Sequence, residues 1–129
     1  MKFTLIQASL GIPMLYLAAT LSDQYRKPAV GSFEYMKKEI FQGCDISMKE
    51  SFYCGDAAGR PKTETRPKDF SDSDIKFAAN VGIKFLTPEE LFLDQKQAKV
   101  KNTSLDAFFK KQASDQKAAS KVTPKEEVK

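Results

Sequence analysis

The 129-residue sequence contains no histidine, only two cysteines and no long uninterrupted run of apolar residues. Without histidine, neither Ser-His-Asp nor Cys-His catalysis is available to the chain. Two cysteines without metal-ligand spacing, and with no histidine to assist them, argue against a structural zinc site. No apolar segment approaches the length that a membrane-spanning helix needs. These absences exclude histidine-dependent catalysis and argue against zinc-finger and membrane-spanning classes.

The cysteines leave two interpretations open. Cys44 and Cys54 could form one disulfide bond in a secreted protein, and the apolar run up to Leu21 could then be a secretory signal. Against this, Cys54 falls within an apolar strand pattern, where a free cysteine behaves as a small apolar residue. Two reduced thiols are therefore the alternative. The apolar run is also interrupted, by Thr4, Gln7, Ser9, Gly11 and Pro13.

Charge divides the chain into two parts. Residues 1–93 carry 12 basic and 12 acidic side chains, whereas residues 94–129 carry nine lysines and five acidic side chains. We therefore expect a single domain over 1–93 and a lysine-rich, disordered tail over 94–129. A lysine-rich tail on a neutral domain fits a polyanionic partner, although such a tail can also serve only to keep a protein soluble.

Alternating helical and strand patterns predict an α/β fold with a parallel sheet and flanking helices. Helices are expected at about 3–10, 33–42 and 71–80, and strands at 14–20, 51–54 and 83–86. Glycines at positions 11, 43 and 82 should end the three helices. Ser71 is expected to cap the third helix, with Asp72 and Asp74 in its first turn. Thr-Pro-Glu-Glu at 87–90 predicts a capping box that begins a short fourth helix.

Asp56 is a candidate metal ligand. It follows Gly55 directly after the apolar strand predicted at 51–54, and ligands bind at the carboxyl ends of strands in parallel sheets. The next basic residue is Arg60, so the Asp56 carboxylate is better placed for a hard cation than for an ion pair. The alternative is an ordinary turn containing glycine and aspartate.

Three segments in order point to a known family. They read Tyr-Arg-Lys-Pro at 25–28, Gly-Asp-Ala-Ala-Gly-Arg at 55–60 and Asp-Phe-Ser-x-x-Asp at 69–74. Together they resemble the phosphatase domain of polynucleotide kinase 3′-phosphatase, in the haloacid-dehalogenase-like superfamily. The similarity covers about residues 10–92. It implies an intracellular, nuclear protein that acts on DNA 3′-phosphate ends, contacts repair proteins and does not associate with membranes. An intracellular location in turn favours reduced thiols at Cys44 and Cys54.

The resemblance also implies roles for particular residues. In this family an aspartate attacks a phosphate ester and forms an aspartyl-phosphate, which water then hydrolyses. A lysine neutralises the developing charge, and acidic residues after a later strand hold Mg²⁺. An ordinary surface position is the alternative for each basic residue, and a first-turn helix charge is the alternative for Asp74. The expected roles are catalytic for Lys27, metal-binding for Asp56, Asp74 and, less strongly, Asp69, and DNA-binding for Arg26 and Arg60.

The sequence departs from the family pattern in the residues that begin the reaction. No Asp-x-Asp follows an apolar strand, so the chain contains no nucleophile, and the family's earlier phosphate-binding Thr or Ser is also missing. We therefore expect a partial haloacid-dehalogenase-like, Rossmann-like sheet that lacks the nucleophile strand. The function predicted is that of an inactive fragment of a polynucleotide 3′-phosphatase from DNA strand-break repair. The alternative is a non-catalytic remnant that binds nucleic acid or protein.

Overall fold

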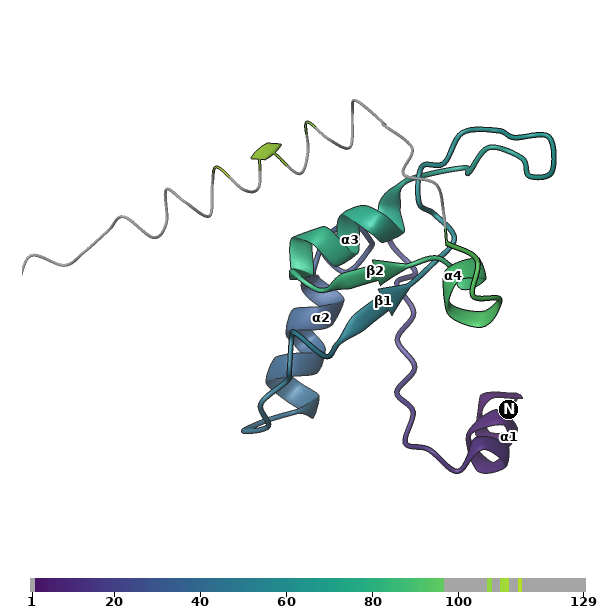
Figure 1. Ribbon diagram of the computed structural model, residues 1–129. Coiled ribbons are helices and arrows are strands. Elements are labelled where there is room, and N and C mark those ends of the chain that lie inside the picture. Colours follow the sequence, from purple (N-terminus) through teal and green to yellow (C-terminus); the bar gives the residue numbers. More distant parts are fainter. Residues whose placement is uncertain (1, 97–106, 108–109, 112–113, 115–129) are drawn as a thin grey trace, which may run out of the picture.

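The computed structural model describes residues 2–96 together with residues 107, 110, 111 and 114 (Figure 1). The expected tail therefore lies almost entirely outside the described residues. The element order is α1 (Lys2–Leu10), α2 (Gly31–Tyr35), the π-helical η1 (Met36–Ile40), β1 (Phe52–Cys54), α3 (Ser73–Val81), β2 (Lys84–Leu86) and α4 (Pro88–Phe92). This is a small α/β arrangement, as the alternating patterns predict.

A two-stranded parallel sheet forms the centre of the fold. β1 pairs with β2 in the register Phe52↔Lys84, Tyr53↔Phe85 and Cys54↔Leu86. The Gly55 amide extends the ladder by donating to the Leu86 carbonyl at 3.2 Å. Parallel neighbours require a crossover, and the chain between them supplies α3, which packs against both strands. β1 therefore ends beside the first turn of α3.

Helix α3 begins one residue later than the sequence predicts. Asp72 occupies the N-cap position and makes no capping hydrogen bond, although its carboxylate pairs with Lys76 at 2.7 Å. The predicted cap, Ser71, instead accepts a hydrogen bond from the Ser73 amide at 3.2 Å. Asp74 lies in the first helical turn, and Gly82 ends the helix with φ of 86°, both as predicted.

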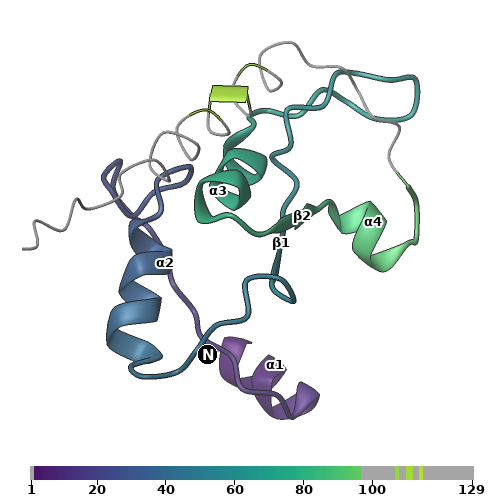
Figure 2. The same cartoon turned by 60° about the vertical axis from the view of Figure 1, so that its left-hand side comes forward.

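The strand predicted at 14–20 is wrong. Those residues form no strand, and within the described residues β1 has β2 as its single neighbour. A strand needs a partner for its backbone groups, and none lies beside this segment. Figures 1 and 2 show the segment as a long connection, with α1 set apart from the sheet. Its apolar side chains stay largely exposed, including Leu15 at 44% and Leu17 at 48%.

The core is correspondingly small. Among the described residues, the buried apolar side chains are Ala57, Ala58, Phe77 and Ala78. Phe77 packs edge-on against Tyr53 with ring centroids 4.9 Å apart, which joins α3 to β1. The helix predicted at 33–42 is present as α2 and η1, but it contributes no fully buried residue. The tightly packed residues therefore lie around the segment that follows β1.

Three other local predictions are confirmed: the capping box, the free thiols and the glycine after α1. Thr87 and Glu90 form the complete capping box that begins α4. Cys44 and Cys54 are both free thiols in the structure. Gly11 follows α1 with φ of 64°. Over the part of the chain that the structure describes, no helix combines the length and apolar character of a membrane span.

Candidate active site at the carboxyl end of β1

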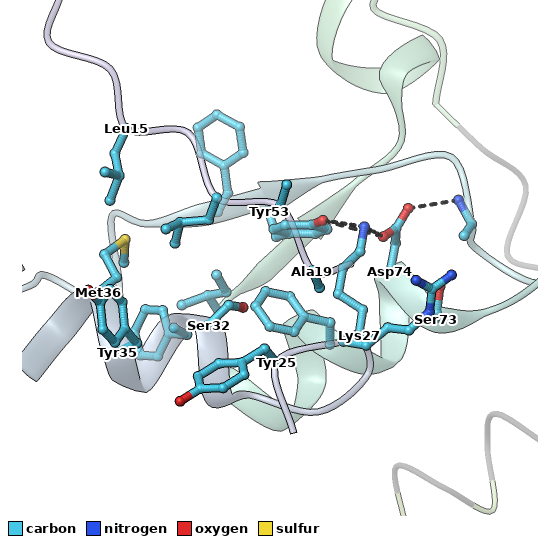
Figure 3. Close-up of a pocket in the computed structure, with 18 of the residues that line it drawn as sticks. Leu15, Ala19, Tyr25, Lys27, Ser32, Tyr35, Met36, Tyr53, Ser73 and Asp74 are labelled. Atoms are coloured by element: carbon cyan, nitrogen blue, oxygen red, sulfur yellow. Dashed lines mark hydrogen bonds and ion pairs between the residues drawn. The ribbon is translucent and has the colours of Figure 1, made fainter. Parts of the chain in front are cut away.

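Lys27 and Asp74, 47 residues apart in sequence, meet beside Tyr53. The Lys27 ammonium forms an ion pair with Asp74 Oδ1 and donates to the Tyr53 hydroxyl at 2.9 Å. The same hydroxyl donates to Asp74 Oδ1 at 3.3 Å. Figure 3 shows the ammonium held between the tyrosine hydroxyl and the carboxylate. The structure thus brings two of the predicted site residues into direct contact.

Asp74 is held firmly from the opposite side. The residue is 3% exposed, and its Oδ2 accepts a hydrogen bond from the Ala57 amide at 3.0 Å. Its own amide donates to the Ala57 carbonyl, also at 3.0 Å. A Cβ at Gly55 would lie 2.7 Å from Asp74 Cβ and would overlap the carboxylate. Glycine at position 55 is therefore what lets the helix carboxylate approach the end of β1.

The surroundings keep Lys27 charged and Tyr53 neutral. Burial by itself would lower the pKa of Lys27, but the hydrogen bonds to Asp74 and Tyr53 outweigh it and raise that pKa. Burial raises the pKa of Tyr53, partly opposed by its hydrogen bond with Lys27. At neutral pH the site therefore presents an ammonium beside a neutral phenol.

The loop that carries Lys27 is tied to α3. The Asn80 side-chain amide donates to the Pro28 carbonyl at 2.8 Å. At the other end of the turn, the Gly31 amide donates to the Gln24 carbonyl at 3.0 Å. The Lys27-Pro28 peptide bond is cis. Asn80 and Asp74 lie on one helix, so α3 holds both the loop and the partner of its lysine.

Asp56 is the carboxylate best suited to a metal. It is exposed, and its carboxylate makes no hydrogen bond or ion pair with any described residue. It lines the same hollow as Lys27 and Asp74. Mg²⁺ binds through one or two carboxylates while keeping several waters, so a single free aspartate fits part of such a site. In the described chain, no group of three acidic or thiol side chains gathers around it.

Asp69 lies in a different cluster from Asp56. Its Oδ2 accepts from Arg60 Nε at 2.8 Å, and its Oδ1 accepts from Arg66 at 2.8 Å. Burial alone would raise the pKa of Asp69, but the hydrogen bonds from Arg60 outweigh it and lower that pKa. Both carboxylate oxygens are thus engaged, which leaves Asp69 poorly suited to direct metal binding.

The two arginines predicted to face DNA differ in position. Arg60 is only 8% exposed, and its guanidinium contacts Asp69 and, at 3.0 Å, Glu89. This position favours a structural role over contact with a polynucleotide. Arg26 is exposed and lines the hollow beside Lys27. Of the two, Arg26 is the one whose position allows it to reach a ligand.

The hollow itself is large and mostly apolar. It has a volume of about 940 Å³ and lies between the segment 15–19, helix α2 and β1. Its charged lining residues are Arg26, Lys27, Asp56 and Asp74, and Figure 3 shows Lys27 and Asp74 together at one end. Aromatic and aliphatic side chains line the rest, including Leu15, Leu17, Phe33, Tyr35, Met36, Phe52 and Ile83.

Sequence reasoning missed Tyr53 and Glu89. Alternation along a strand places Tyr53 and Gly55 on the same face of β1, and Gly55 is where Asp74 approaches. That alternation is the signal that could have identified Tyr53. The sequence places Glu89 within the capping-box segment at 87–90, and nothing local indicates that it contacts Arg60, 29 residues earlier.

Comparisons with known proteins cover most of the described chain. Residues 1–92 match a family model described as "Polynucleotide kinase 3 phosphatase". The chain is 43% identical over 93 residues to a bifunctional polynucleotide phosphatase/kinase of Schizosaccharomyces pombe, covering 72% of this chain and 21% of that protein. It is 52% identical over 71 residues to polynucleotide 3′-phosphatase ZDP of Arabidopsis thaliana, covering 55% of this chain and 9% of that protein. A polynucleotide 3′-phosphatase of Saccharomyces cerevisiae is 43% identical over 77 residues, covering 54% of this chain and 30% of that protein. The match thus spans less than a third of each of these relatives.

Proposed function

The chain belongs to the polynucleotide kinase 3 phosphatase family, and from this premise we propose that it carries part of a polynucleotide 3′-phosphatase. The complete protein would remove 3′-phosphates from DNA ends during strand-break repair, in the nucleus. The observation that carries the proposal is the Lys27–Asp74 ion pair at the carboxyl end of β1, in the same hollow as the unpaired Asp56 carboxylate. An ammonium and a free carboxylate that line one hollow suit a phosphate ester and its counterion.

Lys27 is the catalytic residue in this proposal. Its ammonium is positioned before any substrate arrives, so it can neutralise charge that develops on the transferred phosphoryl group without reorganisation. Asp74 holds the ammonium in place, and the Ala57 amide holds Asp74. The geometry favours this positioning role for Asp74 over direct metal binding, because both of its oxygens already accept hydrogen bonds.

Asp56 would hold Mg²⁺. When bound, the ion would supply positive charge that polarises the phosphate oxygens. Asp56 contributes one charged oxygen ligand at the end of β1, and its exposure leaves room for water and for substrate oxygens. Asp69 is the least supported of the three predicted ligands, because arginines occupy both of its oxygens.

The attacking carboxylate is not among these 129 residues, since no Asp-x-Asp follows a strand. We therefore propose that the isolated chain releases no phosphate from a 3′-phosphorylated oligonucleotide. The attacking carboxylate would be supplied by polypeptide outside these 129 residues. The test is a chimera in which residues 1–92 replace the matching segment of the S. pombe relative. The chimera should release phosphate in the presence of Mg²⁺.

Matched variants of the chimera separate chemistry from folding. Lys27→Met should lower kcat about a hundred-fold, because one positioned charge in a site of this kind contributes two to three orders of magnitude. Lys84→Met removes an exposed lysine from β2 and should leave kcat unchanged. A folded chimera without activity, or one in which both lysine variants behave alike, would contradict the proposal.

A second candidate function is binding without catalysis. The loop at 61–68 projects from the body of the molecule and exposes Lys62 and Lys68 (Figure 1). Such a loop could contact the phosphates of a nucleic acid. This candidate predicts that the 129-residue chain binds an oligonucleotide with an affinity that falls as salt rises. Binding that is unaffected by salt, or by replacing both lysines with glutamine, would exclude it.

A further inference from the structure

Tyr53 has no role in the proposed function so far, although its hydroxyl touches both members of the central ion pair. We propose that Tyr53 is a positioning residue that, together with Asp74, fixes the orientation of the Lys27 ammonium. This proposal deepens the proposed function and rests on it, since the orientation of the ammonium serves catalysis only if Lys27 acts on a phosphate. The contacts themselves can be tested without any phosphatase activity.

The hydroxyl of Tyr53 forms a hydrogen bond with each member of the pair. It accepts a hydrogen bond from Lys27 Nζ at 2.9 Å and donates one to Asp74 Oδ1 at 3.3 Å. The Lys27 ammonium also lies 5.4 Å from the centre of the Tyr53 ring. The ammonium thus lies beyond the hydroxyl and not over the face of the ring, so the hydroxyl is the group of Tyr53 that restricts this long and otherwise flexible lysine.

The tyrosine is itself rigid. Its ring packs edge-on against Phe77 at 61°, and Phe77 is 6% exposed. Its backbone lies in β1 opposite Phe85. A phenylalanine at position 53 would keep the ring packing and the strand pairing. The hydroxyl is thus the atom that distinguishes a purely packing role from a positioning role.

The geometry leaves the ammonium with a free donor. A lysine ammonium has three N–H groups. Asp74 and Tyr53 accept two of them, and no other described residue accepts from Lys27 Nζ. The Lys27 side chain remains 41% exposed. Two fixed acceptors determine the direction of the third N–H group, which remains for an incoming phosphate oxygen.

The test measures proton exchange of lysine ammonium groups by ¹H–¹⁵N NMR on the full chain. Hydrogen-bonded ammonium protons exchange with water slowly, so Lys27 should exchange more slowly than the exposed Lys84 of β2. Tyr53→Phe should speed exchange at Lys27 about five-fold, the loss expected for one hydrogen bond. Tyr35→Phe is the matched control, since Tyr35 lines the same hollow but its hydroxyl bonds to no described residue.

Each outcome decides the proposal. Faster exchange at Lys27 in Tyr53→Phe alone supports it. Equal exchange at Lys27 and Lys84 in the unmodified chain overturns it, and this result needs no variant to fold. Unchanged exchange in Tyr53→Phe, or the same acceleration in Tyr35→Phe, overturns it as well. If the exchange prediction fails, the phosphatase result for the chimera still stands. If the chimera is inactive, the measured exchange rates still stand, so the two proposals can fail independently.

Discussion

Arg60 and Asp69 form a bidentate ion pair, and both side chains are less than a tenth exposed. Arg60 Nε lies 2.8 Å from Asp69 Oδ2, and a second guanidinium nitrogen lies 3.2 Å from Oδ1. The amides of Ala58 and Arg60 also donate to Oδ2. This one carboxylate therefore closes the base of the loop that runs from 60 to 69.

Replacing Asp69 by asparagine should destabilise the fold strongly. The change would leave the Arg60 guanidinium buried without its main counter-charge, which typically costs about 3 kcal/mol or more. Asp72→Asn makes the same chemical change in a partly exposed pair with Lys76 and should cost about 0.5 kcal/mol or less. Urea unfolding of both variants provides the comparison. Equal losses of unfolding free energy in the two variants would show that burial of the Arg60–Asp69 pair adds no stability.

The same pair predicts an acid-sensitive stability. The pKa of Asp69 is lowered in the folded chain, so its contribution to stability is complete above the unfolded value of about 3.8. This contribution is lost as the pH falls from that value through the lower folded pKa. The unmodified chain should therefore lose stability below about pH 4, measured as a falling urea midpoint. Asp69→Asn should show a weaker dependence over the same range, whereas an unchanged slope would contradict the assignment.

Gly55→Ala should disturb the site as well as the fold. The added methyl group would overlap the Asp74 carboxylate and should cost about 1–3 kcal/mol. Because Asp74 holds Lys27, exchange of the Lys27 ammonium protons should also become faster. Gly11→Ala is the comparison: at its φ of 64° it should cost about 1 kcal/mol, with no effect on Lys27. Slow exchange at Lys27 in Gly55→Ala would show that the close approach is not needed.

Mg²⁺ should bind weakly near Asp56. Titration followed by backbone amide NMR should shift the signals of residues 55–58 in a saturable way. Asp56→Asn should weaken this binding about ten-fold or more, because the site loses its unpaired charged ligand. Asp45→Asn removes an exposed aspartate elsewhere and should leave the titration unchanged. Shifts centred on residue 69 would instead favour Asp69 as the ligand.

Local sequence signals predicted the elements that depend on neighbouring residues. The capping box of Thr87 and Glu90 and the glycine that ends α3 at position 82 need only a few consecutive residues, and both are present. The first residue of α3 was missed by one position, because Ser71 and Asp72 are both good caps. The strand at 14–20 failed because a strand depends on a neighbour that no local pattern reveals.

The site shows the same division between local and distant signals. Asp56 is predicted from its position after the strand at 51–54. Lys27 and Asp74 are predicted through a family resemblance, because no local pattern relates them across 47 residues. For Arg60 the resemblance predicts DNA binding, with an ordinary surface position as the alternative. Its burial depends on Asp69 and Glu89, which lie 9 and 29 residues later in the chain. Sequence reasoning thus identified the charged groups and missed their partners.

The hydrogen bond from Asn80 to the Pro28 carbonyl attaches the loop that carries Lys27 to α3 without using the side chain that acts in the site. The anchor on the loop is a main-chain oxygen, which every amino acid possesses. Side chains at positions 25 and 26 can therefore be exchanged, by evolution or by design, without removing this link, whereas Lys27 forms a second link to α3 through Asp74. A scaffold of this kind can acquire or lose chemistry one side chain at a time while its architecture persists.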